Sequence, residues 1–185
     1  SLLIACSPSD PTLNPLSTDA TILAFGDSLT YGTGADRAES YPSVLSQLLQ
    51  RKVVNAGIPG EVSHDGLERL VDMLAETSPD LVILCHGGND LIQRKSSAVL
   101  KSNLDQMINL IHEQGAQVIL IAVPSFNITM SVPDLYAELA EQYQLPIEED
   151  IIRQLERDVK MKSDTVHPNA AGYRVMAEHI YSLLQ

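Results

Sequence analysis

The stretch Thr21-Ile22-Leu23-Ala24-Phe25 is a short and almost wholly apolar run that leads directly into Gly26-Asp27-Ser28. A run of this length and composition is typical of a β-strand that is buried on both faces. Similar runs recur at Lys52–Ala56, Leu81–Cys85 and Gln117–Val123. We therefore expect these four segments to be strands of one sheet.

The segments between the strands carry apolar residues at helical spacing. Helices are predicted from about Tyr41 to Gln50, from Leu67 to Leu74, from about Ser97 to Gln114, from Leu135 to Tyr143, from Ile151 to Val159, and after Pro168. The stretch Leu145–Ile147 is at most a short edge strand, because its proline cannot donate to a central ladder. The alternation of strand and helix predicts an α/β protein with a parallel sheet covered on both faces, a three-layer α/β/α sandwich.

The composition indicates one globular domain with a mainly aliphatic core. The chain has 185 residues, of which 44% are hydrophobic and 19% charged, with six Tyr, two Phe and no Trp. A domain of this length needs neither disulfides nor a structural metal. Its net charge of −12 disfavours binding to nucleic acid or to an anionic membrane. No apolar run reaches the ~18 residues of a transmembrane segment, and we expect a monomer.

The N-terminal residues 1–19 are predicted to be a tail, and residues 20–185 a single domain. After Cys6 the tail contains three prolines and few apolar residues, as in a linker. The stretch Leu3-Ile4-Ala5-Cys6 resembles a bacterial lipobox, whose cysteine carries a lipid anchor. We therefore expect a periplasmic, cell-envelope or secreted protein; the alternative is a chance apolar segment on a cytoplasmic protein.

The remaining cysteine, Cys85, lies in an apolar run and is predicted to be buried. The two cysteines form no disulfide framework and have no zinc-site spacing. The histidines and acids show no metal-binding motif. We expect no metal.

Glycines and polar residues follow the predicted strands where each one ends. Gly26–Gly32 follows the first strand, Asn55–Glu61 the second and Gly87–Asp90 the third, while Asp164–Pro168 precedes the last helix. In open α/β folds, ligands bind beyond the carboxyl ends of the strands, where the strand order reverses. The four segments therefore predict a single functional site.

Ser28, His167 and Asp164 are the side-chain types that nucleophilic catalysis needs. Serine is a poor nucleophile at neutral pH unless a neighbouring base takes its proton, and histidine suits that task. Asp164 lies three residues before His167 and can orient the imidazole through its other nitrogen. We predict that Ser28 is the nucleophile, His167 the base and Asp164 its orienting acid.

The tetrahedral intermediate of such a reaction needs hydrogen-bond donors for its oxyanion. Donors are available from the backbone N–H of Ser28, from a glycine N–H after the second strand, and from the side-chain amide of Asn89. Both Gly57 and Gly60 are candidates for the glycine. Asp27 is predicted to brace its loop rather than to act as a second catalytic acid.

Four segments, Gly26-Asp27-Ser28-Leu29, Gly60, Gly88-Asn89-Asp90 and Asp164-Thr165-Val166-His167, together resemble the blocks of the SGNH hydrolases, also called GDSL esterases and lipases. In order and spacing they are similar to a small bacterial branch that contains thioesterases, lysophospholipases and arylesterases. The resemblance covers about Thr21 to Leu184.

This resemblance implies a flavodoxin-like sheet of five parallel strands, the SGNH hydrolase fold, and no cofactor. It implies a catalytic triad of Ser28, His167 and Asp164. It also implies an oxyanion hole formed by Ser28, Gly60 and Asn89, which favours Gly60 over the other glycine.

Three features depart from the family pattern. His86 stands where relatives in this branch usually have an apolar residue, and Cys85 where an acid is often found. The segment Pro124–Asp134 does not resemble the expected substrate-covering loop. We expect His86 to be a packed residue or, alternatively, to line the pocket. The departures bear on acyl-chain preference and leave the triad unaffected.

The sequence therefore predicts a serine esterase that hydrolyses small carboxylic esters, with short acyl or aryl groups, through an acyl-enzyme on Ser28. An acyl thioesterase, a lysophospholipase and a carbohydrate acetylesterase are alternatives on the same triad. A different class of function is a flavodoxin-like module in which Ser28, Thr30 and Thr33 bind a phosphate or a flavin. The acidic composition and the lack of a nucleotide-binding fingerprint argue against it.

Overall fold

The structure, a computed structural model, describes residues 11–185. Its sheet has five parallel strands in the order β2-β1-β3-β4-β5. The strands are β1 (Thr21–Gly26), β2 (Lys52–Gly57), β3 (Leu81–Cys85), β4 (Gln117–Ile121) and β5 (Ile147–Glu148). The chain passes from β1 to β2 on one side and then to β3 on the other, so the strand order reverses beside β1. The predicted five-stranded parallel sheet is confirmed.

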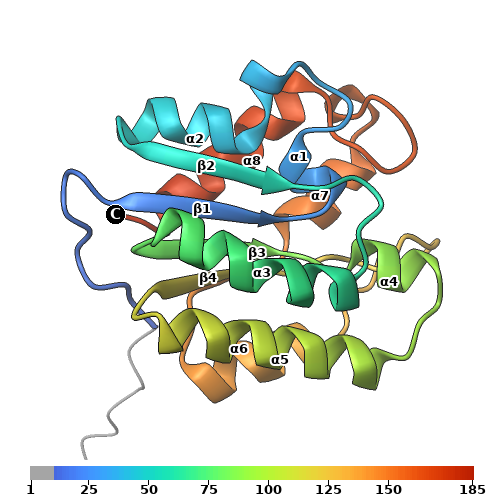
Figure 1. Ribbon diagram of the computed structural model, residues 1–185. Helices are drawn as coiled ribbons and strands as arrows, with labels where there is room; N and C mark the ends of the chain where they lie inside the picture. The colour runs from blue at the N-terminus through green and yellow to red at the C-terminus, as the bar shows by residue number, and fades with distance from the viewer. Residues whose placement is uncertain (1–10) are drawn as a thin grey trace, which may run out of the picture.

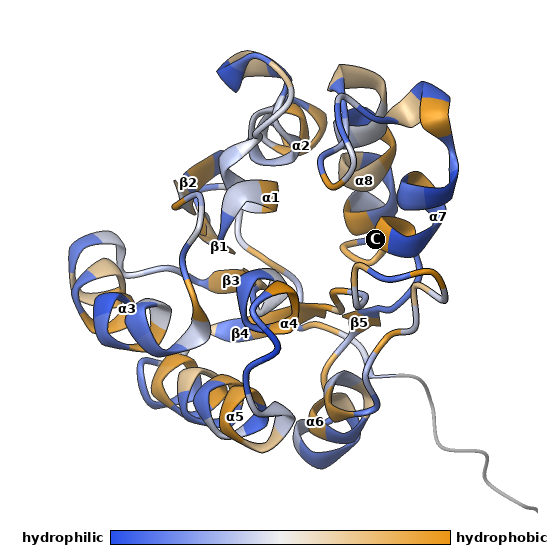
Figure 2. Ribbon diagram, turned by 90° about the vertical axis from the view of Figure 1, so that its right-hand side faces the viewer, coloured by the Kyte–Doolittle hydropathy of each residue, from blue (hydrophilic) through white to orange (hydrophobic). Residues whose placement is uncertain are grey.

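Helices cover both faces of the sheet (Figure 1). They are α1 (Ser28–Tyr31), α2 (Tyr41–Leu49), α3 (Ser63–Thr77), α4 (Gly88–Ile92), α5 (Ser97–Glu113), α6 (Leu135–Tyr143), α7 (Ile151–Arg157) and α8 (Ala170–Ser182). Helices α2 and α8 pack together on one face, and α3, α5 and α6 lie on the other. Figure 2 looks onto the carboxyl ends of the strands, where α1 and α4 lie near the middle of the molecule.

The differences from the predicted elements lie at their ends and in the shortest helices. Strand β4 ends at Ile121, two residues before the predicted end. Helix α7 ends at Arg157 because Asp158 adopts an extended conformation. Val159, predicted to face the core as part of that helix, is instead 84% exposed. Helices α1 and α4 were not predicted, since four and five residues are too few to show a helical period.

The core is mainly aliphatic, as predicted, and includes three fully buried tyrosines, Tyr41, Tyr136 and Tyr173. A buried tyrosine hydroxyl needs a hydrogen-bond partner. In the same order, the three hydroxyls bind Thr30 Oγ1 (3.0 Å), the His86 carbonyl (2.9 Å) and the Thr33 carbonyl (2.8 Å). These partners lie in the loops beyond β1 and β3, so the tyrosines attach those loops to the core.

Other predictions concern the tail and the second cysteine. Cys6 and its predicted lipidation lie outside the described residues, and the division of the chain after residue 19 stays a prediction. Cys85 is buried as expected, and burial raises the pKa of its thiol. No helix within residues 11–185 combines the length and the apolar character needed to cross a bilayer.

Gly26 is a position in the sheet where a side chain should be poorly tolerated. A Cβ there would lie 2.0 Å from the Cys85 carbonyl oxygen on β3 and 2.4 Å from Thr30 Oγ1. The first contact is with the backbone of a paired strand, which cannot move without disturbing the ladder. We expect Gly26→Ala to lower the free energy of unfolding by about 3 kcal/mol, as measured by urea denaturation.

Gly115→Ala is the control for this measurement. Gly115 has a φ of +79°, but no atom lies within 4 Å of its Cβ position. The substitution should therefore cost only the roughly 1–2 kcal/mol of a left-handed conformation. Equal losses of stability in the two variants would contradict the close approach of β1 to β3.

Candidate active site

Ser28 begins α1 directly beyond the carboxyl end of β1. The carboxylate of Asp27 accepts a hydrogen bond from the N–H of Leu29 (3.2 Å), which caps this short helix. The N–H of Gly32 donates to the Ser28 carbonyl (3.1 Å) and closes the turn. The tight turn leaves the Ser28 side chain partly exposed, where it lines a cavity.

The three side chains predicted to form a triad lie in a continuous hydrogen-bonded row. His167 Nε2 lies 3.0 Å from Ser28 Oγ, although the two residues are 139 positions apart in the chain. His167 Nδ1 lies 2.8 Å from Asp164 Oδ2. Both distances are within the range of direct hydrogen bonds.

The three-residue spacing of Asp164 and His167 has a local explanation. Asp164 Oδ1 accepts the backbone N–H groups of Val166 (2.7 Å) and His167 (2.8 Å), which makes a side-chain-stabilised turn. This turn leaves Oδ2 free to bind the imidazole. The N–H of Ser163 donates to the His167 carbonyl (2.9 Å) and closes the loop.

The ionisation of Asp164 decides which ring nitrogen of His167 carries the proton. Partial burial raises the pKa of Asp164, but hydrogen bonds from the His167 ring and from the two backbone N–H groups outweigh it and lower the pKa to about 2. At neutral pH the carboxylate can only accept, so Nδ1 of His167 is the donor. Nε2 is then left with its lone pair, and the Ser28 hydroxyl donates to it.

A buried ion pair supports the loop that carries Asp164. Lys162 Nζ lies 2.7 Å from Glu156 Oε2. The same ammonium donates to the carbonyls of Glu156 and Thr165, both at 3.1 Å. Burial raises the pKa of Glu156. These contacts attach the end of α7 to the residues on both sides of Asp164.

Gly60 lies in a tight turn that borders the cavity. The N–H of Glu61 donates to the Ile58 carbonyl (3.2 Å) across this turn, and Gly60 has a φ of +83°. Proline and then a glycine with positive φ at its centre are typical of a type II turn. Gly57, the other candidate, donates its N–H to Asn55 Oδ1 (3.0 Å). The N–H of Gly57 is therefore already committed.

Asn89 also borders the cavity. Its side-chain nitrogen donates to the Glu61 carbonyl (2.9 Å) and to Asp27 Oδ2 (3.2 Å). Both hydrogens of the amide thus have partners in the free protein. The longer bond, to Asp27, is the one that an oxyanion would have to replace.

The cavity that these residues surround measures about 200 Å³. Besides the groups already described, its lining contains Thr33 and the apolar residues Leu29, Pro59, Ile92, Phe126 and Val166. Phe126 comes from the segment after β4 that does not resemble the expected substrate loop. The arrangement provides an activated serine, an apolar recess and hydrogen-bond donors at one place.

Residues 24–175 match the model of the GDSL-like lipase/acylhydrolase family. The chain belongs to this family. The resemblance inferred from the four sequence blocks is thereby confirmed, and the protein is a carboxylic-ester hydrolase of the SGNH type.

Relatives of this GDSL-like hydrolase include proteins named as esterases. The chain is 31% identical to an arylesterase of Vibrio mimicus over 86% of its own length and 85% of the relative. It is 28% identical to the thioesterase 1/protease 1/lysophospholipase L1 of Escherichia coli over 89% of its length and 83% of the relative. The crystal structure of TesA superimposes with a TM-score of 0.82 at 28% identity, covering 89% of this chain and 98% of that one.

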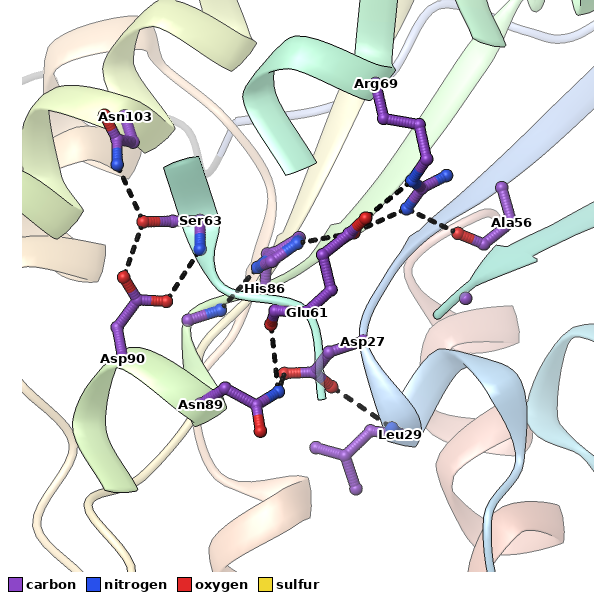
Figure 3. Close-up of polar contacts among 12 residues, drawn as sticks. Asp27, Leu29, Ala56, Glu61, Ser63, Arg69, His86, Asn89, Asp90 and Asn103 are labelled. Atoms are coloured by element: carbon purple, nitrogen blue, oxygen red, sulfur yellow. Dashed lines mark hydrogen bonds and ion pairs between the residues drawn. The ribbon is translucent and has the colours of Figure 1, made fainter. Parts of the chain in front are cut away.

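A group of charged residues that was not predicted from the sequence lies beside Asn89 in this hydrolase (Figure 3). Glu61 is buried and binds both Arg69 and His86. His86 is fully buried and packed, which was the first of the two interpretations offered. Its occurrence at a normally apolar position was the only signal in the sequence, and it did not identify a partner.

Asp27 has the contacts of a bracing residue. Its side chain is buried and accepts hydrogen bonds from the N–H of Leu29 and the amide of Asn89. Burial raises the pKa of its carboxyl group, against the opposing effects of His86 and the backbone. The carboxylate therefore connects the loop that carries Ser28 with the loop that carries Asn89.

Thr30, offered as a phosphate ligand in the flavodoxin-like alternative, is buried and bonded to the Tyr41 hydroxyl. It cannot reach a ligand in the cavity. Within residues 11–185, no cluster of three or more His, Cys, Asp or Glu side chains is arranged to bind a metal ion.

The lowered pKa of Asp164 makes its contribution to stability depend on pH. The pKa of an aspartate in an unfolded chain is ~3.9, whereas the pKa of Asp164 in the fold is lowered to about 2. Its carboxylate therefore stabilises the fold above about pH 4, and this contribution is lost as the pH falls towards 2. We expect the Tm of the wild type to exceed that of Asp164→Asn at pH 5, and the difference to shrink by pH 2.5.

The same substitution at Asp72, which is exposed on α3, controls for the removal of one acidic residue. Thermal unfolding followed by circular dichroism gives both Tm values. A difference between wild type and Asp164→Asn that stays constant from pH 5 to pH 2.5 would contradict the assigned ionisation.

Proposed function

We propose that this carboxylic-ester hydrolase cleaves short-chain acyl and aryl esters through an acyl-enzyme on Ser28. The observation that carries the proposal is the unbroken row from Ser28 Oγ to His167 (3.0 Å) and from His167 to Asp164 (2.8 Å), beside an apolar cavity. A serine bonded to a base, with the base bonded to a carboxylate, is the arrangement that nucleophilic acyl transfer requires.

In the first half of the reaction, Ser28 Oγ attacks the ester carbonyl carbon while its proton passes to Nε2 of His167. Asp164 remains ionised and stabilises the imidazolium that forms. The tetrahedral intermediate then collapses, the bond to the leaving oxygen breaks, and His167 donates the proton to the departing alcohol or phenol. The acyl group stays on Ser28 as an ester.

We assign the oxyanion to the N–H groups of Ser28 and Gly60 and to the amide of Asn89. The turn at Gly60 supports this choice, because Gly60 borders the cavity and has no side chain to block the approach of a substrate to its backbone. The oxyanion replaces Asp27 as the acceptor of one Asn89 hydrogen, while the Glu61 carbonyl keeps the other. Each donor in such a site contributes about 3–4 kcal/mol to the transition state.

In the second half, a water molecule takes the place of the leaving group. His167 removes its proton, the water oxygen attacks the acyl carbon, and the intermediate releases the carboxylic acid and restores the Ser28 hydroxyl. The Ser28 hydroxyl and the His167 ring are then ready for another substrate, and no cofactor is needed for this cycle.

The size of the cavity supports a small acyl or aryl group. A volume of about 200 Å³ is below the roughly 300–1,000 Å³ of pockets that enclose drug-sized ligands. The apolar residues Ile92, Phe126 and Val166 suit a hydrocarbon or aromatic group. The net charge of −12 favours neutral over anionic substrates.

An acyl thioester is the second candidate substrate. The triad attacks a thioester carbonyl by the same steps, and the Escherichia coli relative is named as a thioesterase and lysophospholipase. Carbohydrate acetyl esters would also fit a small acyl site. Export through the lipobox at Cys6 and a monomeric state remain proposals that rest on the sequence alone.

The proposed triad predicts that Ser28 is the serine that reacts with esters and with fluorophosphonates. We expect Ser28→Ala to lower kcat for p-nitrophenyl butyrate by about 10⁴–10⁶-fold, and a fluorophosphonate probe to label Ser28 in the wild type only. Ser102→Ala, at an exposed position on α5, serves as the matched control and should keep full activity and labelling. Ester hydrolysis by Ser28→Ala above background would contradict the mechanism.

The cavity predicts the preferred chain length. We expect kcat/KM for p-nitrophenyl esters to be highest at two to four acyl carbons and to fall by about tenfold or more by twelve carbons, because the longer chain cannot be enclosed in so small a volume. A panel that includes an acyl thioester, a lysophospholipid and an acetylated sugar completes the measurement. A maximum for long-chain substrates would show that the acyl group binds elsewhere.

A further inference from the structure

A buried carboxylate lies directly behind the proposed oxyanion hole. Glu61 is 8% exposed, and its two oxygens accept hydrogen bonds from Arg69 Nε (2.7 Å) and Nη2 (2.6 Å). Its Oε2 also lies 3.1 Å from His86 Nε2. None of the proposed chemical steps uses these three side chains, which Figure 3 shows together.

The backbone fixes the tautomer of His86. The N–H of Gly87 donates to Nδ1 of the ring (3.0 Å), so Nδ1 carries a lone pair. Nε2 therefore carries the hydrogen and donates it to Glu61. Helix α3 packs directly on this nitrogen, since a Cβ on Gly66 would lie 2.4 Å from it. The imidazole of His86 is therefore held between the Gly87 N–H and α3.

Arg69 fixes the other side of the carboxylate. Besides its two bonds to Glu61, Nη2 donates to the Ala56 carbonyl on β2 (3.0 Å). The guanidinium also lies 4.2 Å from the centre of the Phe25 ring on β1, close enough for a cation–π contact. Glu61 is therefore connected to two strands of the sheet through one side chain.

The same residue determines where both non-serine donors lie. Glu61 closes the turn that contains Gly60, and its own carbonyl accepts the amide of Asn89 (2.9 Å). His86 lies three residues before Asn89, in the loop after β3. The contact between Glu61 and His86 thus joins the loops of β2 and β3, which flank β1 and Ser28 in the sheet.

We propose that His86 and Arg69 are positioning residues of the oxyanion hole, acting through Glu61 on the N–H of Gly60 and the amide of Asn89. The proposal rests on the proposed function. A buried carboxylate that loses a donor must find another or move towards water. A shift of the Glu61 backbone would displace both oxyanion donors at once, and catalysis is sensitive to displacements of about 1 Å.

His86→Leu and His86→Gln form the main test. Leucine fills the space but removes the donor to Glu61, whereas glutamine can present an N–H to Glu61 and an oxygen to the Gly87 N–H. For p-nitrophenyl butyrate we expect His86→Leu to lower kcat by about tenfold. This is less than the 10²–10³-fold loss expected when an oxyanion donor is removed altogether, because the donors are displaced and not lost. KM should stay within about twofold, and His86→Gln should recover most of the rate.

A second readout separates positioning from stability. The affinity of an alkylboronic acid, which forms a tetrahedral adduct with the serine, should fall in His86→Leu by about the same factor as kcat/KM. The affinity of butyrate, a product without a tetrahedral centre, should not change. Leu74→Ala, in the half of α3 away from the site, is the control for lost stability and should keep wild-type kcat well below its Tm.

Arg69→Lys extends the test if His86→Leu fails to fold. Lysine keeps the charge but cannot make the two-point contact with Glu61. We again expect kcat to fall about tenfold with KM nearly unchanged.

The outcomes distinguish this proposal from the proposed function. A wild type that neither hydrolyses esters nor reacts with fluorophosphonate at Ser28 would refute the function itself. An active wild type whose folded His86→Leu keeps kcat within twofold would overturn the positioning role. The positioning role would also be overturned if kcat of His86→Leu fell no further than kcat of a Leu74→Ala variant with the same Tm. It would be overturned as well if His86→Leu changed KM and not kcat. If only Arg69→Lys folds, the same criteria apply to it.

Discussion

The site depends on how closely the chain approaches itself at the carboxyl end of β1. A Cβ on Gly26 would lie 2.0 Å from the Cys85 carbonyl, and a Cβ on Gly57 would lie 2.0 Å from the backbone nitrogen of Tyr31. These two glycines are partners in the register of β1 and β2. Without side chains at these points, α1 rests directly against the sheet, and Ser28 has a fixed position from which the other groups are arranged.

The two halves of the site are supported in different ways. Asp164 and His167 are held by a local turn, in which one carboxylate oxygen binds two backbone N–H groups and the other binds the ring. The opposite side is supported by long-range contacts, in which Glu61 binds Arg69 from α3, His86 from the loop after β3 and Asn89 from α4. The first arrangement tolerates partial exposure to solvent. The second is buried and so depends on every donor being present.

This contrast explains what could be predicted from the sequence. Apolar runs between glycine-rich loops identified the long strands. The pairing of Asp164 with His167 could be predicted because the two residues lie three positions apart, within one turn that the Asp164 side chain itself stabilises. The charged group around Glu61 has no such local signature, because Glu61 and His86 are 25 positions apart and meet only once β2 and β3 have both joined β1. Likewise, α1 and α4, with four and five residues, are shorter than the stretch over which a helical period can be recognised. The extended backbone at Asp158 that exposes Val159 is that of a cap, whose side chain accepts the N–H of Lys160.

A hydrogen bond between α8 and the segment beyond α1 bears on biosynthesis. The Tyr173 hydroxyl on α8 donates to the Thr33 carbonyl beyond α1, and α8 packs against α2. Ser28, the proposed nucleophile, is translated early and His167, its proposed base, late, and the two meet only when α8 docks. On the proposed mechanism, a chain in which α8 has not yet docked has no base beside Ser28, and the serine is not activated for acylation. The proposed mechanism therefore couples the onset of hydrolysis to the docking of α8.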